Sequence, residues 1–210
     1  MTLDTQSHEF QLLRRQLQKG NVVLFAGAGF SIGATNLEGT HPPLGNDLAS
    51  RLADECGWQY SGEDLTAVFD QARKHLGSQN LNAIISRLYR DCQPAAWHRE
   101  LSRIHWYRIY TTNIDDVIQE SYRSSAVQRL DTIVCPAPYQ DQDVWYSRVQ
   151  CIHLHGSVSD FSKPFTFSLE DFAAQTATPS AWYQALVDDM MSKSFLFVGA
   201  RLNDPLFFTT

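Results

Sequence analysis

Residues 22–29 read Val22-Val23-Leu24-Phe25-Ala26-Gly27-Ala28-Gly29, a short apolar run that ends in a pair of glycines. A continuous apolar run of this length, rich in β-branched side chains, is typical of a parallel strand buried on both faces. Glycines directly after such a strand allow positive φ angles and a close approach of the backbone to a ligand. The stretch therefore predicts the first strand of an α/β sheet, followed by a candidate phosphate-binding turn.

Further strands and helices alternate along the chain. We expect strands at 107–112, 132–134, 149–155 and 194–198, the last another buried apolar run, and helices at 8–19, 44–56, 65–76, 81–89, 114–122 and 182–191. Residues 8–20 then form a leading helix, and 58–105 form a helical insertion with a polar break at 77–80. The pattern predicts an α/β fold, an open and mostly parallel Rossmann-like sheet with helices on both faces.

Composition limits the class of protein. The chain has 210 residues, 43% of them hydrophobic, and 17 Lys and Arg against 23 Asp and Glu give a net charge of −6. We expect one domain over 1–210, with a further chain or a partner beyond it. Since no block of consecutive basic residues occurs, direct nucleic-acid binding and membrane-surface binding are not expected.

The N-terminus and the cysteines indicate the compartment. Residues 1–6 have neither a basic nor an apolar region, so no secretory signal is predicted and a cytoplasmic setting follows. The cysteines at positions 56, 92, 135 and 151 contain no C-x-x-C pair. We therefore expect buried, reduced thiols and no zinc module.

A polar group follows the second predicted strand, in the sequence Tyr110-Thr111-Thr112-Asn113-Ile114-Asp115-Asp116. One interpretation is structural, with Asn113 as the N-cap of the next helix and the two aspartates complementing its dipole. In the other, the amide of Asn113 and the carboxylate of an aspartate face a sugar and a cationic ring at the edge of the sheet.

Two more groups of candidate site residues lie at the ends of later strands. Cys151, His153 and His155 would share one face of a strand, which makes a metal site conceivable, but no fourth ligand is evident. His155 stands beside Gly156 at the strand end, where an imidazole can act as a general base. Gly199 and Arg201 follow the last strand; either they line an adenosine and its phosphates, or they form a solvent-exposed turn.

The glycine pair does not fit the common nucleotide signatures. The dinucleotide pattern G-x-G-x-x-G fails because Ile32 occupies the third glycine position, and no acidic residue ends a second strand about 20 residues later. No Gly-Lys-Ser/Thr follows either, so this is not a P-loop.

Taken together and in order, these groups resemble the sirtuin family. The matching residues are Gly-Ala-Gly-x-Ser at 27–31, Thr-Asn-Ile-Asp at 112–115, His155-Gly156 and the strand followed by Gly199. The closing sequence Phe-Val-Gly-Ala-Arg-Leu-Asn-Asp-Pro at 197–205 and the helix entry at 42–48 look more like the bacterial sirtuin-like domains of anti-phage defence proteins than like protein deacylases.

The resemblance implies a role for each matching residue. Gly27, Ala28, Gly29 and Ser31 would hold the pyrophosphate of NAD. Asp115 would contact the nicotinamide carboxamide, and Asn113 would orient the ribose and the attacking water. His155 would be the base, Thr112 would lie at the ribose, and Gly199 and Arg201 would line the adenosine end. A carboxylate or amide oxygen suits the oxocarbenium-like state through which the nicotinamide–ribose bond breaks.

The resemblance also implies an activity, with NAD as the substrate and no metal. The expected function is hydrolysis of NAD⁺ to nicotinamide and ADP-ribose in an abortive-infection response, by a homo-oligomer that a sensor domain or partner activates, for example a short argonaute-like protein or a sensor of phage proteins. The alternatives are NAD-dependent protein deacylation, and a non-catalytic module that binds NAD or ADP-ribose. Residues 157–168 lack the cysteines of the deacylase zinc module, and no Phe-Gly-Glu strand is found. Discrimination between NAD and NADP stays open, since Arg201 or Arg51 could meet a 2′-phosphate.

Overall fold

Five parallel strands form the centre of the computed structural model, which describes residues 5–124, 126–141, 146–177 and 180–201. The strands are β1 (Val22–Ala26), β2 (Arg108–Thr111), β3 (Arg129–Val134), β4 (Arg148–His153) and β5 (Ser194–Val198). Their order in the sheet is β3-β4-β2-β1-β5, and every pairing between the described strands is parallel. The predicted open, Rossmann-like α/β sheet is confirmed, and it is parallel throughout the described strands.

The strand register brings the predicted motifs to one edge. Ala26, the last residue of β1, lies opposite Thr111 of β2 on one side and Val198 of β5 on the other. Thr111 in turn lies opposite His153, the last residue of β4. Because the strands are parallel, the loops that follow these residues all leave from the carboxyl edge. Since later strands lie on both sides of β1, this edge contains a topological switch point, where open α/β sheets bind ligands.

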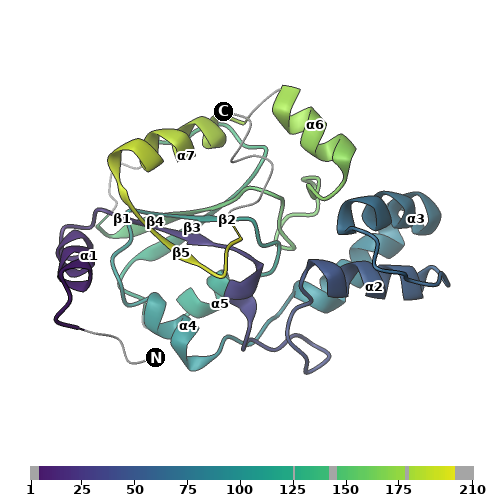
Figure 1. Cartoon of the computed structure of the whole chain (residues 1–210), viewed down its shortest axis with the longest axis horizontal. Coiled ribbons are helices and arrows are strands. Elements are labelled where there is room, and N and C mark those ends of the chain that lie inside the picture. The colour runs from purple at the N-terminus through teal and green to yellow at the C-terminus, as the bar shows by residue number, and fades with distance from the viewer. Residues whose placement is uncertain (1–4, 125, 142–145, 178–179, 202–210) are drawn as a thin grey trace.

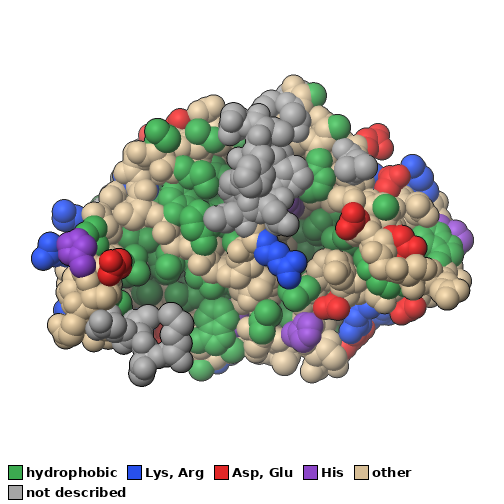
Figure 2. Space-filling model, in the orientation of Figure 1, with side chains coloured by type: hydrophobic (Ala, Val, Ile, Leu, Met, Phe, Trp, Pro, Cys, Tyr) green, Lys and Arg blue, Asp and Glu red, His purple; other side chains and the backbone are tan. Residues whose placement is uncertain are grey.

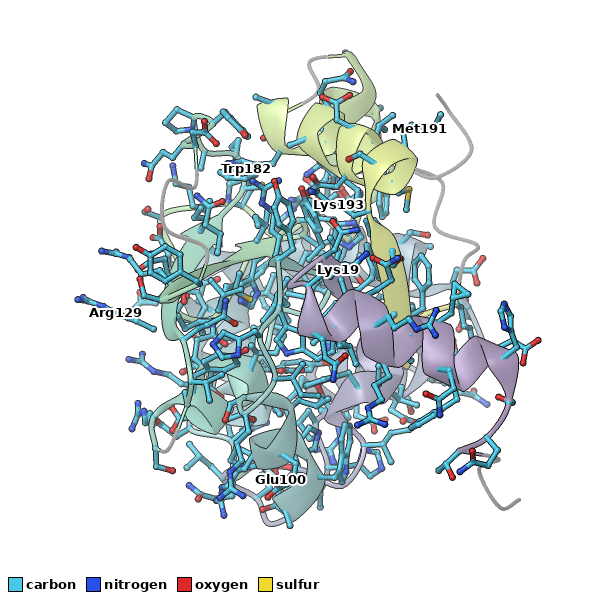
Figure 3. All side chains as sticks on the ribbon, turned by 90° about the vertical axis from the view of Figure 1, so that its left-hand side faces the viewer. Lys19, Glu100, Arg129, Trp182, Met191 and Lys193 are labelled. Carbon is cyan, nitrogen blue, oxygen red and sulfur yellow. The ribbon has the colours of Figure 1, made fainter. Side chains whose placement is uncertain are left out.

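Helices cover both faces of the sheet (Figure 1). Val22, Leu24 and Ala26 of β1 face a core shared with α1 (His8–Gln18), α4 (Ala96–Leu101) and α5 (Val117–Tyr122), while Val23 and Phe25 face α7 (Ala181–Ser192). Figure 3 views this arrangement from the side of α1, with Trp182 of α7 above the sheet and Glu100 of α4 below it. Burial on both faces explains why β1 is apolar without alternation.

The helical insertion forms its own core beside the sheet (Figure 1). That core joins α2 (Gly45–Glu55), which precedes the predicted insertion, to the long α3 (Leu65–Tyr89), whereas α4 packs on the core that β1 shares with α1 and α5. The two predicted helices at 65–76 and 81–89 are one element with a kink, because only Gly77 leaves the helical conformation, with φ of +74°. The predicted polar break at 77–80 is therefore a single residue. A short 3-10 turn, η1 (Ala28–Ser31), follows β1, and α6 (Leu169–Ala177) is a helix that the sequence pattern did not predict.

Three strand predictions require correction. β5 has the predicted bounds but is an edge strand and is only half-buried; Phe197 is 37% exposed. Hydrophobic side chains gather on that face of the molecule (Figure 2). β3 begins at Arg129, before the predicted start, because an edge strand tolerates polar residues. β4 ends at His153, so His155 lies in the turn beyond the strand and does not share a strand face with Cys151.

The cysteines are free thiols, and all are buried except Cys56, which is half-buried. No helix in the described part of the chain combines the length and the apolar character that crossing a bilayer requires.

Candidate functional site

A buried hydrogen-bond network joins the loop after β1 to the loop after β2. Ser31 Oγ donates to Asp115 Oδ2 at 2.6 Å, and Asn113 Nδ2 donates to Ser31 Oγ at 3.0 Å. Between 2% and 6% of each of these residues is exposed. The three polar residues that the sequence singled out in two distant motifs thus meet at one point.

Asn113 is anchored through its backbone as well. Its N–H donates to Thr111 Oγ1 at 2.9 Å, and that hydroxyl donates to the carbonyl of Ala26 in β1. The carbonyl of Asn113 accepts a hydrogen bond from His153 Nδ1, at 2.9 Å. Its side-chain Oδ1 is buried and has no hydrogen-bond partner among the described residues. A buried amide oxygen without a partner is costly, so this atom is a candidate acceptor for a water or a ligand group.

Asn113 does not cap the next helix, and the structural interpretation of this motif is wrong for that residue. α5 begins at Val117, and the carboxylate of Asp115 accepts its N–H at 3.1 Å. The carboxylate of Asp116 accepts the N–H groups of Asp91 and Cys92 and so ties the end of the helical insertion to this loop. Asp116 therefore has a structural role, and Asp115 serves both the helix and the network.

Burial makes Asp115 a weaker acid than an exposed aspartate. Removal from water raises the pKa of this carboxyl from 3.8 to about 6, although the hydrogen bonds from Ser31 and Val117 act in the opposite direction. A carboxyl held in this range, in a cavity, is a frequent mark of a functional site. Near neutral pH it is mostly ionised and can accept a hydrogen bond from a ligand amide.

These residues line a cavity of about 170 Å³. The polar part of the wall comes from Ser31, Thr112, Asn113, Asp115 and His155, and Ala28 lies beside them. Most of the remaining lining comes from the segment before α2, from α2 and α3, and from the segment before α6: Pro42, Pro43, Gly45, Leu48, Leu65, Tyr89 and Phe167. A lining that is partly polar and partly apolar suits a flat, partly polar ring joined to a sugar.

His155 lies in the turn beyond β4. It is 5% exposed, its ring meets Phe172 edge-on at 5.5 Å, and its carbonyl accepts the N–H of Thr166. The next residue, Gly156, has φ of +89°, and a side chain there would lie 2.7 Å from the carbonyl of Pro164. The turn therefore requires glycine after the histidine, and it places His155 at the cavity wall.

The glycines after β1 meet the last described loop rather than the cavity. Gly27 N–H donates to Val198 O at 3.0 Å, and Gly29 N–H donates to Gly199 O at 2.9 Å. Neither glycine adopts the positive φ that its residue type allows: Gly27 has φ of −108°, and Gly29 lies in the η1 turn. Gly199 has the positive φ, +65°, and a Cβ there would lie 2.0 Å from Phe30 N. The glycines thus allow the loops after β1 and β5 to touch.

Other predicted residues lie away from the cavity wall. Arg201 is exposed and is the last described residue. Arg51 pairs with Glu38 at 2.6 Å and lines a separate shallow groove. Among the described residues no three His, Cys, Asp or Glu side chains are grouped so as to hold a metal ion, and His155 does not share a strand face with Cys151 and His153.

The sequence did not reveal several residues that build the site. Tyr89 lines the cavity, and its hydroxyl donates to Pro43 O at 2.8 Å. His98 is fully buried, and its Nε2 lies 2.7 Å from Phe30 O, next to Ser31. Both come from the insertion, far along the chain, and isolated Tyr and His residues carry no local signal for such contacts.

Comparison with known proteins shows what the chain resembles. Residues 107–210, which include the strands β2 to β5, match the model of the SIR2-like domain family. The chain is 26% identical over 198 residues to "NAD(+) hydrolase ThsA" of Enterococcus faecium, and 23% identical over 199 residues to the protein of the same name from Bacillus cereus (strain MSX-D12). These matches cover 90% and 91% of this chain but 39% of each relative, so the chain spans about two fifths of their length.

Proposed function

We propose that this chain binds NAD⁺ and hydrolyses it to nicotinamide and ADP-ribose. The observation that supports this best is the buried network of Ser31, Asn113 and Asp115, with Asn113 Oδ1 lacking a partner among the described residues, in the wall of a cavity that also contains His155. The relatives named as NAD(+) hydrolases and the SIR2-like match support the same chemistry.

In this proposal four polar residues of the cavity act directly on the substrate or the water. His155 accepts the proton of the attacking water, and Asn113 holds that water and the nicotinamide ribose. Asp115 accepts a hydrogen bond from the carboxamide of nicotinamide, and Thr112 lies at the ribose. Water adds its oxygen to the anomeric carbon as the carbon–nitrogen bond breaks, and nicotinamide leaves as a neutral molecule. The transition state resembles an oxocarbenium ion, which nearby oxygen atoms stabilise.

The pyrophosphate and adenosine would extend from the cavity towards the loops after β1 and β5. Ala28 and Ser31 line the cavity, and Gly27 and Gly29 lie against Gly199. In this proposal these glycines and Arg201 would meet the far end of the nucleotide. Because the N–H groups of Gly27 and Gly29 donate to the β5 loop, we propose that the nucleotide engages this turn by moving the two loops apart.

We also propose that all of 1–210 acts as one catalytic domain, and that an oligomeric assembly with a sensor domain or partner protein controls it in defence against phage. An unregulated NAD⁺ hydrolase would exhaust a cofactor that its own cell needs, so such an enzyme requires control. Comparing turnover by the purified chain with turnover by its complex in the cell of origin tests this part of the proposal.

The central test measures NAD⁺ consumption and identifies the products. Asn113→Ala and His155→Ala should abolish turnover but retain NAD-dependent stabilisation against heat. Asn80→Ala and His105→Ala, at exposed positions outside the cavity, are the matched controls and should behave like the wild type. Persistent turnover in the cavity variants contradicts the assigned roles. Stabilisation by NAD without turnover in the wild type or its complex favours a non-catalytic binding module.

A further inference from the structure

His153 lies at the end of β4 and contacts the loop of Asn113. The imidazole is fully buried, with Nδ1 2.9 Å from the carbonyl oxygen of Asn113 and Nε2 2.8 Å from Gln119 Nε2. A backbone carbonyl can only accept a hydrogen bond, so Nδ1 carries the proton. Nε2 is then the acceptor for the amide of Gln119, and the two contacts together select one tautomer.

The imidazole of His153 is unsuited to proton transfer in the cavity. Burial lowers its pKa to about 4, so the ring is neutral near neutral pH. Both ring nitrogens are occupied within the protein, and His153 does not line the cavity wall formed by the described residues. These contacts indicate that His153 has a role other than proton transfer.

We propose that His153 and Gln119 are positioning residues that hold Asn113 in its working orientation. This inference rests on the proposed function, in which Asn113 holds water and ribose. Three contacts fix Asn113: its N–H to Thr111, its Nδ2 to Ser31 and its carbonyl to His153. The carbonyl contact fixes the peptide plane between Asn113 and Ile114, and through it the direction in which the Asn113 side chain leaves the backbone.

The sheet holds the residues that position Asn113. His153 pairs with Thr111 in the register of β2 and β4, so the imidazole stands on a rigid strand directly beneath the loop that it holds. Gln119 lies in the first turn of α5, which packs on the same sheet. A loop held by a strand and a helix loses little entropy when substrate binds, which favours catalysis.

Two nearly isosteric variants separate positioning from packing. His153→Leu removes every hydrogen bond of the ring, whereas the amide nitrogen of His153→Asn stands close to the position of Nδ1 and still donates to Asn113 O. We expect His153→Leu to lower kcat about 100-fold with KM changed less than about threefold, since a misplacement of about 1 Å is enough for that loss. His153→Asn should recover at least about tenfold of it. Equal kcat values in the two variants overturn the proposal.

A second pair of variants, at Gln119, tests the proposal if His153→Leu does not fold. Gln119→Met keeps the length of a half-buried side chain on α5 but removes the donor to Nε2. Gln119→Glu instead places a carboxylate at Nε2, which favours the imidazolium and so raises the pKa of His153. Both ring nitrogens then carry a proton, so Nε2 donates to the carboxylate and Nδ1 still donates to Asn113 O. We expect a kcat loss of about tenfold in Gln119→Met and a smaller one in Gln119→Glu. A Gln119→Met variant with the kcat of the wild type contradicts the proposal.

A measurement without turnover distinguishes this inference from the proposed function. If the wild-type chain and its complex do not cleave NAD⁺, the proposed function fails, and nitrogen NMR of the histidine rings still tests the positioning. We expect a neutral His153 with its proton on Nδ1 down to about pH 5.5, and side-chain amide signals of Asn113 that move more in His153→Leu than in His153→Asn. A proton on Nε2 alone, or an imidazolium at neutral pH, overturns the assignment.

Discussion

Ser31 Oγ donates a 2.6 Å hydrogen bond to Asp115 Oδ2 across 84 positions of the sequence. The bond links the η1 turn after β1 to the loop after β2, and Asn113 Nδ2 completes the link from the same side. It also partly offsets the effect of burial on Asp115, because hydrogen bonds to the ionised form lower the pKa of a carboxyl. The Ser31 hydroxyl therefore both helps to form the cavity wall and lowers the pKa of Asp115.

The stability of the protein should depend on the protonation of Asp115. A buried carboxyl with a pKa of about 6 binds its proton more tightly in the folded state than in the unfolded state, where the pKa is near 3.8. Asp115 therefore destabilises the fold increasingly as the pH rises through this interval, by up to about 3 kcal/mol. Asp115→Asn keeps an acceptor for Ser31 and removes the charge.

Urea unfolding of the wild type and of Asp115→Asn at about pH 4 and about pH 8 measures this dependence. The variant should gain stability relative to the wild type on going to the higher pH. A difference that stays constant with pH would show that Asp115 has the same pKa in both states.

Gly199 should be intolerant of any side chain. A Cβ at this position would lie 2.0 Å from Phe30 N, in addition to the strain of a φ of +65°. Gly57 has φ of +72°, and a Cβ there would meet no atom within 4 Å, so Gly57→Ala is a control for backbone strain alone. Gly57→Ala should cost about 1 kcal/mol, and Gly199→Ala at least about 2 kcal/mol more. Denaturant unfolding measures the loss of stability in each variant. Equal losses in the two variants would contradict the contact between the loops after β1 and β5.

His98 should hold the η1 turn through one defined tautomer. Its Nδ1 accepts the N–H of Ala95 at 3.0 Å, and its Nε2 donates to Phe30 O at 2.7 Å. His98→Leu leaves both backbone groups without these partners and should lower the free energy of unfolding by about 2 to 4 kcal/mol. His98→Gln can still donate near the position of Nε2 and should lose about half as much. Equal losses in the two variants, measured by urea unfolding, would attribute the effect to ring packing alone.

The buried ion pair beneath α7 should be costly to break from one side. Arg108 Nη1 lies 2.6 Å from Asp189 Oδ2, with 3% and 8% of the two side chains exposed, and Tyr110 also donates to this carboxylate. Asp189→Leu or Arg108→Met alone should cost about 3 to 5 kcal/mol, because either leaves one buried charge unpaired. The double variant should recover much of that loss.

The exposed pair of Arg103 and Glu100 is the matched control for this double-mutant cycle. Breaking it should change the free energy of unfolding by less than about 1 kcal/mol. A single-variant loss at Arg108 or Asp189 that is no larger than in this control would contradict the burial of the pair.

Local patterns predicted the bounds of several elements. β1 and β5 have the predicted bounds, and α1, α2 and α7 begin and end within about two residues of the predicted ones. Patterns failed where a neighbour decides the outcome. The apolar run of β5 looks like that of a central strand, yet it lies at an edge. The helix α6 was not predicted. Asn113 has the chemistry of an N-cap, but the helix begins four residues later.

The order of the amino acids was enough to locate the strands and the residues at their carboxyl ends, because apolar runs, glycines and helical spacing act over a few residues. It also indicated the polar residues of the candidate site, Ser31, Asn113, Asp115 and His155. The folded chain was needed to establish that Ser31 meets Asp115, that Gly29 touches Gly199 and that His153 supports Asn113. These contacts depend on strand order and register, which arise from packing between segments far apart in the chain, and no local pattern encodes them.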